Sequence, residues 1–375
     1  LKNMCLSYRS IEHSFPCQKG FFMPQRVTYH DEQDVENTLK LREVLKTLPG
    51  FCRDYFRAME PTTSTKTRIS YAYDIRVFFR FLKERNPALR TMDIRDFPVD
   101  VLDQLEAVDI EEYQEYLKVY EASSCDKQIT NGERGLKRKM SALRSFYTYY
   151  YKRQVISSNP TLLVDMPKIH EKSIIRLEAN ETAALLDYIE HGGDELTGQR
   201  KMYYEKTKAR DLAIVTLLLG TGIRVSECVG LDIQDIDFDN NGIRIVRKGG
   251  NETIVYFGDE VADALKAYLP VREGITPIAG HENALFYSTQ RRRIGVQAVE
   301  NMVKKYARAI TTTKKITPHK LRSTYGTSLY RETGDIYLVA EVLGHKDVNT
   351  TRKHYAAMGE DRRRQAASAV HLRRD

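Results

Sequence analysis

The chain has 375 residues, of which 41% are hydrophobic and 29% charged, and its formal net charge is +8. This length is enough for a large buried core in two or three domains, and the composition is that of a soluble globular protein. No run of 18 apolar residues is present, which argues against a membrane span, and the N-terminus has no signal pattern, so we expect a cytoplasmic protein.

The first 30 residues give no structural assignment, and helical periodicity begins after them. Helices are predicted at 31–48, 51–59, 65–85, 110–120 and 131–152. In the helix at 65–85, aromatic residues recur at helical spacing, as is typical of a core-facing stripe: Tyr71, Tyr73, Phe78, Phe79 and Phe81. We expect an N-terminal extension with a helical segment over 1–60, a helical domain over 61–157 and a linker over 158–173.

The predicted helix 131–152 has an apolar face and a basic face. The basic residues are Lys137, Arg138, Lys139 and Arg144. Such a helix can pack by one side and lie along a phosphate backbone by the other. We therefore predict these four residues, together with Arg291 and Arg292, to be DNA contacts. A single basic run is usually a solvated face, but separate basic runs in several segments favour nucleic acid over a membrane surface.

A second domain, predicted over 174–375, begins with helices near 180–191 and 209–219. Three short antiparallel strands are predicted between Ile233 and Phe257, followed by helices near 261–269 and 296–310 and a short strand at 285–286. The Gly220-Thr221-Gly222 turn lacks the third glycine of a dinucleotide-binding loop, and no phosphate-binding loop ending in Gly-Lys occurs. The five scattered cysteines form no Cys-x-x-Cys pair, so we predict no cofactor and no metal.

The segment 316–355 contains the densest set of chemically active side chains. Thr317 and Pro318 predict a helix start, and Gly334 a helix end. His319 and Arg322 lie three apart on that helix, so they share a face. A second helix is predicted over 336–343, followed by Gly344, His345 and, ten residues later, Tyr355. Imidazoles, a guanidinium and a phenol suit phosphodiester chemistry.

Each of these features has an ordinary interpretation on its own. A His-x-x-Arg pair is usually a surface or cap pair, Leu-Gly-His can be a simple helix stop, and 338–355 has the outline of a helix-turn-helix. The functional interpretation depends on their combination with an upstream motif, Arg224 in GTGIRVSE, and with Lys248 in a predicted β-turn.

Arg224, Lys248, His319-x-x-Arg322, His345 and Tyr355, in this order, resemble the tyrosine recombinase (phage integrase) family. The resemblance implies a mainly α fold with a small antiparallel sheet. A helical core-binding domain would join a mixed α/β catalytic domain in a C-shaped clamp around duplex DNA. The enzyme would break and rejoin DNA site-specifically, without metal or ATP.

The resemblance also implies roles for these residues. Tyr355 would attack the scissile phosphate and form a 3′-phosphotyrosine, while Arg224 and Arg322 would hold its non-bridging oxygens. His319 would be the base, Lys248 the acid for the leaving 5′-hydroxyl, and His345 a hydrogen-bond donor to the phosphate.

The spacing of the nucleophile departs from the family's common pattern. In most members the tyrosine lies nine residues after the histidine of Leu-Gly-His, where this chain has His354. We assign Tyr355 because no other tyrosine follows His345, and a mechanism with His354 as nucleophile is the alternative.

Partners and cellular role follow from the resemblance alone. The segment 361–372 predicts a short amphipathic tail helix that would dock on a neighbour in a DNA-bound homo-tetramer, and an accessory DNA-bending protein is a further partner. We expect an integrase or excisionase of a mobile element. A chromosome-dimer resolvase, a type IB topoisomerase and a DNA-binding regulator with a decayed site are the alternatives.

Overall fold

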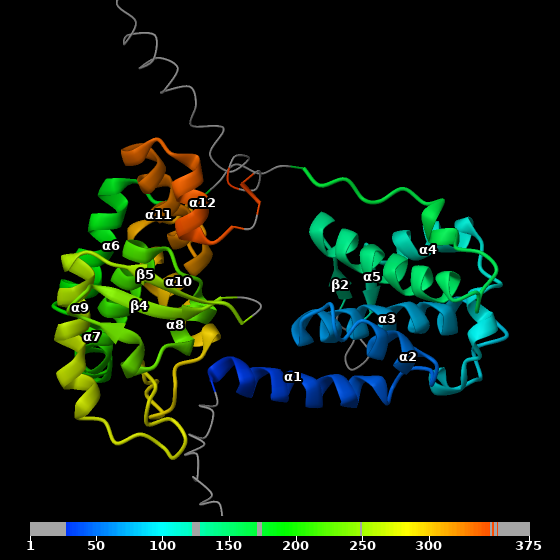
Figure 1. The fold of residues 1–375 in the computed structure, drawn as a ribbon, viewed down its shortest axis with the longest axis horizontal. Helices are drawn as coiled ribbons and strands as arrows, with labels where there is room; N and C mark the ends of the chain where they lie inside the picture. Colours follow the sequence, from blue (N-terminus) through cyan, green and yellow to red (C-terminus); the bar gives the residue numbers. More distant parts are fainter. Residues whose placement is uncertain are drawn as a thin grey trace, which may run out of the picture.

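The computed structural model of the protein describes residues 28–121, 128–170, 175–247, 250–345, 347–348 and 351. These residues form two bodies, a helical domain and a mixed α/β domain (Figure 1). Helix α1 extends along one side from the second body to the first, and the chain that leaves the helical domain passes along the other side.

The first domain is helical, as predicted, and contains one small hairpin. Its described elements are α1 (Tyr29–Leu45), α2 (Cys52–Ala58), α3 (Thr65–Arg85), α4 (Ala107–Tyr116), α5 (Glu133–Lys152), β1 (Val119–Glu121), β2 (Gln128–Thr130) and the 3-10 turns η1 (Ile94–Asp96), η2 (Val99–Leu102) and η3 (Pro160–Leu162). Helix α3 has the predicted bounds, because Ser64 caps its N-terminus by accepting a hydrogen bond from the amide of Thr67. The helix predicted at 110–120 ends at Tyr116, and the prediction is wrong for its last residues, because Val119 and Tyr120 belong to β1, which pairs with β2.

Aromatic side chains fill the core of the helical domain. Phe78, Phe79 and Phe81 of α3 are each at most 2% exposed, which confirms that the predicted stripe is mostly core. Tyr73 is the exception, because it is 43% exposed and stacks under the guanidinium of Arg76. The core rings meet mainly edge to face, the arrangement that their quadrupoles favour.

This core extends beyond the predicted limits of 61 and 157. Leu41 and Val44 of α1 and Phe56 of α2 are buried in it at one end, and Val164 at the other. In α1 the buried residues lie near its C-terminal end, whereas Val35 and Leu39 are exposed. The first part of the predicted linker 158–173 is likewise held on the helical domain, through buried Val164 and the hydrogen bonds of Arg144 to the carbonyls of Thr161 and Val164.

The second domain packs around the apolar second half of α7, from Ala213 to Leu218. Its described elements are α6 (Ala179–His191), α7 (Gly198–Thr221), α8 (Val225–Gly230), η4 (Ile233–Asp235), β3 (Ile236–Asp237), β4 (Gly242–Val246), β5 (Glu252–Tyr256), α9 (Asp259–Glu273), α10 (Val296–Ile310), α11 (Pro318–Thr333) and α12 (Ile336–Leu343). The strands form an antiparallel sheet in the order β3-β4-β5, as predicted. Instead of a strand at 285–286, isolated bridges join Asp232 to Ala284 and Tyr287 to Arg293.

The start of α1 contacts the second domain. The Tyr29 ring packs against that domain's core, and the Arg293 guanidinium lies over it, 5.5 Å from its centroid. A Cβ at Gly230 would lie 3.2 Å from this ring. Because Leu41 and Val44, near the other end of α1, belong to the core of the helical domain, the helix joins the two bodies. None of the helices within the described ranges is long and apolar enough to cross a bilayer.

Candidate phosphodiester-cleaving site

The start of α11 and the end of α12 position three of the predicted catalytic residues, His319, Arg322 and His345. Helix α11 begins at Pro318 and ends before Gly334, which has φ +72°, and α12 ends before Gly344, which has φ +61°. These positive φ values suit glycine, so the predicted bounds of both helices are confirmed for a physical reason. Arg322, one turn into α11, is buried, whereas His319 is exposed.

Arg322 connects the separate motifs of the sequence. Its Nη1 donates to the carbonyl of Gly222, 2.5 Å away, and its Nη2 donates to the carbonyl of Leu343. Gly222 lies two residues before Arg224, and Leu343 two residues before His345. Both carbonyls are at helix C-termini, whose dipoles favour a cation. The guanidinium of Arg322 therefore holds the motifs of Arg224 and His345 together.

Arg224 is oriented by a buried carboxylate. It is the N-cap residue of α8, and its amide and its Nη1 donate to the two carboxylate oxygens of Glu227 at 2.7 and 2.8 Å. The Glu227 side chain is 3% exposed, whereas that of Arg224 is 37% exposed. One edge of the Arg224 guanidinium is thus fixed and part of the side chain is open to a ligand, as bidentate phosphate binding requires.

His345 is held at both its backbone and its ring. Its amide donates to the carbonyl of Ala340 at 2.9 Å, which closes the turn after α12. Its Nδ1 lies 2.7 Å from the hydroxyl of the buried Thr351. This contact fixes the orientation of the imidazole ring.

Two of the predicted catalytic residues, Lys248 and Tyr355, lie outside the described residues. On either side of Lys248 the hairpin between β4 and β5 is closed by hydrogen bonds from the Arg247 amide to the Asn251 carbonyl and from the Gly250 amide to the Arg247 carbonyl. The described residues on either side of the predicted turn are therefore hydrogen-bonded to one another, and the roles of both residues stay predictions.

The basic face predicted for α5 requires correction at two positions. The Lys139 side chain is 8% exposed and pairs with the buried Asp74, to which Arg138 also donates. Arg144 donates to the carbonyls of Thr161 and Val164 and so holds the segment after α5. The geometry assigns structural roles to Lys139 and Arg144. Lys137, which is half-buried, and the exposed Arg138 stay predicted DNA contacts.

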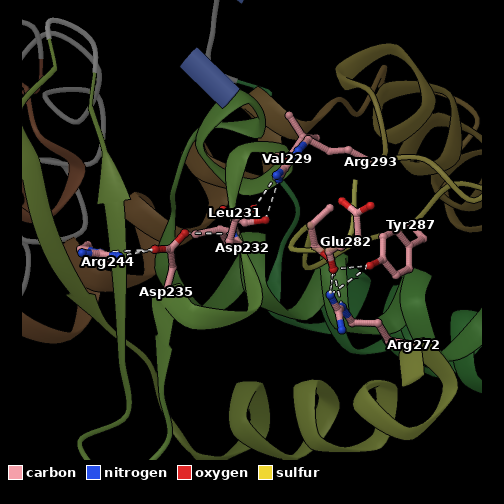
Figure 2. Close-up of polar contacts among 10 residues, drawn as sticks. Val229, Leu231, Asp232, Asp235, Arg244, Arg272, Glu282, Tyr287 and Arg293 are labelled. Atoms are coloured by element: carbon pink, nitrogen blue, oxygen red, sulfur yellow. Dashed lines mark hydrogen bonds and ion pairs between the residues drawn. The ribbon is translucent and has the colours of Figure 1, made fainter. Parts of the chain in front are cut away.

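The three arginines at 291–293 likewise include one residue with a structural role and two exposed residues. Figure 2 shows Arg293 directed into the domain, where it donates to the carbonyls of Val229 and Leu231 and pairs with Asp232. Arg291 and Arg292 occupy an exposed turn that begins at Ser288. They stay predicted DNA contacts, and Arg293 supports the backbone that follows α8.

Sequence reasoning did not assign three residues that complete the site. Glu227 lies three residues after Arg224, at the N3 position of α8, where its carboxylate accepts from the Arg224 amide. Arg247 had no local signal, since its partner Val342 lies 95 residues away, and no sequence pattern links Thr351 to His345 six residues before it. The described part of the chain contains no group of three or more His, Cys, Asp or Glu residues that could hold a metal ion.

Comparisons with known proteins agree with this site. A model of the phage integrase family matches residues 176–362. The chain is 34% identical over 310 residues to Tyrosine recombinase XerC of Caldanaerobacter subterraneus subsp. tengcongensis, with 80% of each chain covered. It is 30% identical over 338 residues to Tyrosine recombinase XerS of Streptococcus equi subsp. zooepidemicus, with 83% of this chain and 93% of the relative covered.

Two solved structures share the fold. XerH recombinase bound to palindromic difH, a post-cleavage complex, has a TM-score of 0.60 at 20% identity and covers 82% of this chain and 80% of its own. The Tn1549 transposon integrase in complex with circular intermediate DNA has a TM-score of 0.57 at 22% identity and covers 81% and 94%. The predicted fold class, a helical domain and a mixed α/β domain in a clamp architecture, is confirmed.

Proposed function

The chain belongs to the tyrosine recombinases of the phage integrase family, enzymes that break and rejoin DNA, and on that premise we propose how it does so. The substrate is duplex DNA, and the intermediate is a 3′-phosphotyrosine at Tyr355. The observation that carries the proposal is the position of Arg322, bonded to the carbonyls of Gly222 and Leu343. These bonds bring the motifs of Arg224 and His345 to one place.

The first step is an in-line displacement at the scissile phosphorus. The Tyr355 oxygen forms a bond to phosphorus as the bond to the 5′-oxygen breaks, and His319 accepts the phenolic proton. Lys248 gives a proton to the departing 5′-oxygen. Arg224, Arg322 and His345 stabilise the charge that develops on the non-bridging oxygens. A 5′-hydroxyl from a second duplex reverses the step and exchanges strands.

The same chemistry serves two cellular roles. One is the integration and excision of a mobile element. The other is the resolution of chromosome dimers, and the similarity to XerC and XerS over most of the chain favours it. Recombination assays on DNA that flanks the gene and on DNA from the chromosomal replication terminus distinguish the two roles, because each role requires a different target.

A paired complex of four copies would carry out the exchange. The segment 361–372, which lies outside the described residues, is the proposed docking tail. A chain truncated after Gly359 should bind a single site with unchanged affinity but fail to pair sites. Undiminished recombination by the truncated chain would refute this role. Full activity of the purified chain alone would exclude a required DNA-bending partner.

Covalent trapping tests the proposed chemistry. The wild-type protein and Tyr355→Phe are incubated with a pool of nicked duplexes, and adducts that survive detergent are counted and their DNA sequenced. Adducts formed only by the wild type support Tyr355 and identify the site. Adducts that persist in Tyr355→Phe would indicate His354 or another nucleophile. Tight binding without adducts from either protein would favour a DNA-binding regulator.

A further inference from the structure

Arg247, the last described residue of the β4 side of the hairpin, contacts the end of α12. Its Nη2 donates to the carbonyl of Val342 at 2.9 Å. Its guanidinium also occupies the space beside Gly344, where a Cβ would lie only 1.1 Å from Nη1. These contacts join two segments that are 95 residues apart in sequence. Both segments lie on the side of the second domain that faces the helical domain (Figure 1).

The contact completes the hydrogen bonding of the C-terminus of α12. The last four carbonyls of a helix have no partner within it. Here the amides of Gly344 and His345 satisfy Glu341 and Ala340, Arg247 satisfies Val342, and Arg322 satisfies Leu343. Two guanidiniums from different elements therefore fix the turn from which His345 projects.

This position is electrostatically demanding for Arg247. Burial lowers its pKa, and the positive charge of Arg224 lowers it further, while Glu227 raises it. The Nε of Arg247 is buried and has no hydrogen-bond partner among the described residues. A residue that only covered apolar surface there would not need a guanidinium. The function of Arg247 at this position is therefore the hydrogen bond that its guanidinium donates to Val342.

We propose that Arg247 is a positioning residue for strand cleavage, which holds the His345 turn against the hairpin between β4 and β5 and so sets the reach of the imidazole to the scissile phosphate. The inference rests on the proposed function. Arg247 acts through His345, because its bond to Val342 and its contact with Gly344 lie within three residues of that histidine.

Single-turnover cleavage of a nicked duplex by full-length protein tests the proposal. Arg247→Met keeps the length of the stem but removes the donors, and we expect cleavage at saturating DNA to fall roughly 10- to 100-fold, the cost of a small misplacement of a catalytic group. The dissociation constant for DNA should change less than about two-fold. Arg244→Met is the matched control, since Arg244 is on the same strand but pairs with Asp235.

A double-mutant cycle with His345→Ala separates positioning from general support of the fold. If Arg247 acts through His345, Arg247→Met should have almost no further effect on cleavage in the His345→Ala background. Should Arg247→Met fail to fold, Arg247→Lys replaces it in the same cycle.

Two outcomes would overturn the proposal: a full additional loss in the His345→Ala background, or a cleavage rate in Arg247→Met equal to that of the wild type. Failure of the proposed function would look different, because the wild-type protein itself would then form no adduct.

Discussion

The basic residues of α5 and the arginines around the end of α12 differ in what holds them. On α5, Arg138 and Lys139 share the buried carboxylate of Asp74. At α12, Arg322 and Arg247 are held by the carbonyls of Gly222, Leu343 and Val342. A carboxylate cancels the charge that it fixes, whereas a carbonyl orients a guanidinium and leaves its charge intact.

The net charge that remains after these contacts differs between the two regions. Arg224, Arg322 and Arg247 contribute three positive charges and Glu227 one negative charge, which leaves +2 among these four residues. On α5, Asp74 removes one of the two charges that it contacts. We therefore expect substitutions around α12 to change cleavage most, and substitutions on α5 to change stability.

Arg322→Lys should have the largest effect. Lysine keeps the charge but cannot donate to Gly222 and Leu343 while also presenting a planar edge to a phosphate. We expect cleavage to fall by about 10²–10³-fold, as for the loss of a donor to a developing oxyanion. The free energy of unfolding should fall by about 2–3 kcal/mol, because charge-assisted bonds to buried carbonyls are lost. Single-turnover kinetics and urea denaturation measure the two effects.

Arg224→Lys is the companion variant, because Arg224, unlike Arg322, does not connect two motifs through hydrogen bonds to their backbone carbonyls. Cleavage should fall while DNA binding survives and stability changes little. Equal cleavage rates for Arg224→Lys and the wild type would show that bidentate phosphate binding is not what Arg224 supplies.

Gly344→Ala should come next. The new Cβ would meet the Arg247 guanidinium, and the left-handed backbone at φ +61° would add about 1–2 kcal/mol of strain. Cleavage should therefore fall roughly 10- to 100-fold by displacement of the His345 turn. Gly334→Ala is the matched control, since it has the same left-handed backbone at the end of α11. An equal loss of cleavage in both variants would mean that backbone strain alone is responsible.

The ends of α11 and α12 could be predicted from the sequence because their signals are local. Proline at the first helical position and glycine after the last act within one turn, whatever the rest of the chain does. The same is true of the order β3-β4-β5, which follows from short alternating runs joined by tight turns. The three-residue strands β1 and β2 are too short to give such a pattern, so that hairpin was missed.

The partners of the arginines could not be predicted. Arg322 bonds to carbonyls 100 and 21 residues away in sequence, and every residue has a carbonyl, so no pattern identifies these two. The burial of Lys139, however, could have been predicted from the sequence. It lies four residues before Leu143 and seven before Phe146, so helical spacing places it on the buried stripe.

Arg144→Met and Lys137→Gln should separate structure from DNA contact on α5. Arg144→Met removes the hydrogen bonds to Thr161 and Val164, so the free energy of unfolding should fall by about 1–3 kcal/mol. The salt dependence of DNA binding by the folded protein should stay unchanged. Lys137→Gln should leave stability unchanged and reduce the slope of log affinity against log salt by about 1. Titrations at several salt concentrations and thermal melts decide between the two roles, and the reverse pattern would restore Arg144 as a phosphate contact.

The smallest expected effect is a pH dependence of the α5 pairing. Burial raises the pKa of Asp74, an effect that Arg138 and Lys139 oppose but do not overcome. The folded state therefore binds the proton more tightly than the unfolded state, whose carboxyl titrates near pH 4. The stability that Asp74 contributes is largest below that pH and is lost as the pH rises through the folded pKa. Asp74→Asn should remove this loss, so its unfolding free energy relative to wild type should increase with pH.

Asp103→Asn is the control of opposite sign in the same domain. Hydrogen bonds from Ser157 and the amide of Ser158 lower the pKa of Asp103, so its contribution is present above pH 4 and lost as the pH falls. Urea denaturation of both variants and the wild type between about pH 3 and 7 compares the slopes. If Asp74→Asn behaved like Asp103→Asn, the cations of α5 would outweigh the burial of Asp74. The ion pairs with Arg138 and Lys139 would then stabilise the charged Asp74 carboxylate, as the hydrogen bonds from Ser157 and Ser158 stabilise that of Asp103.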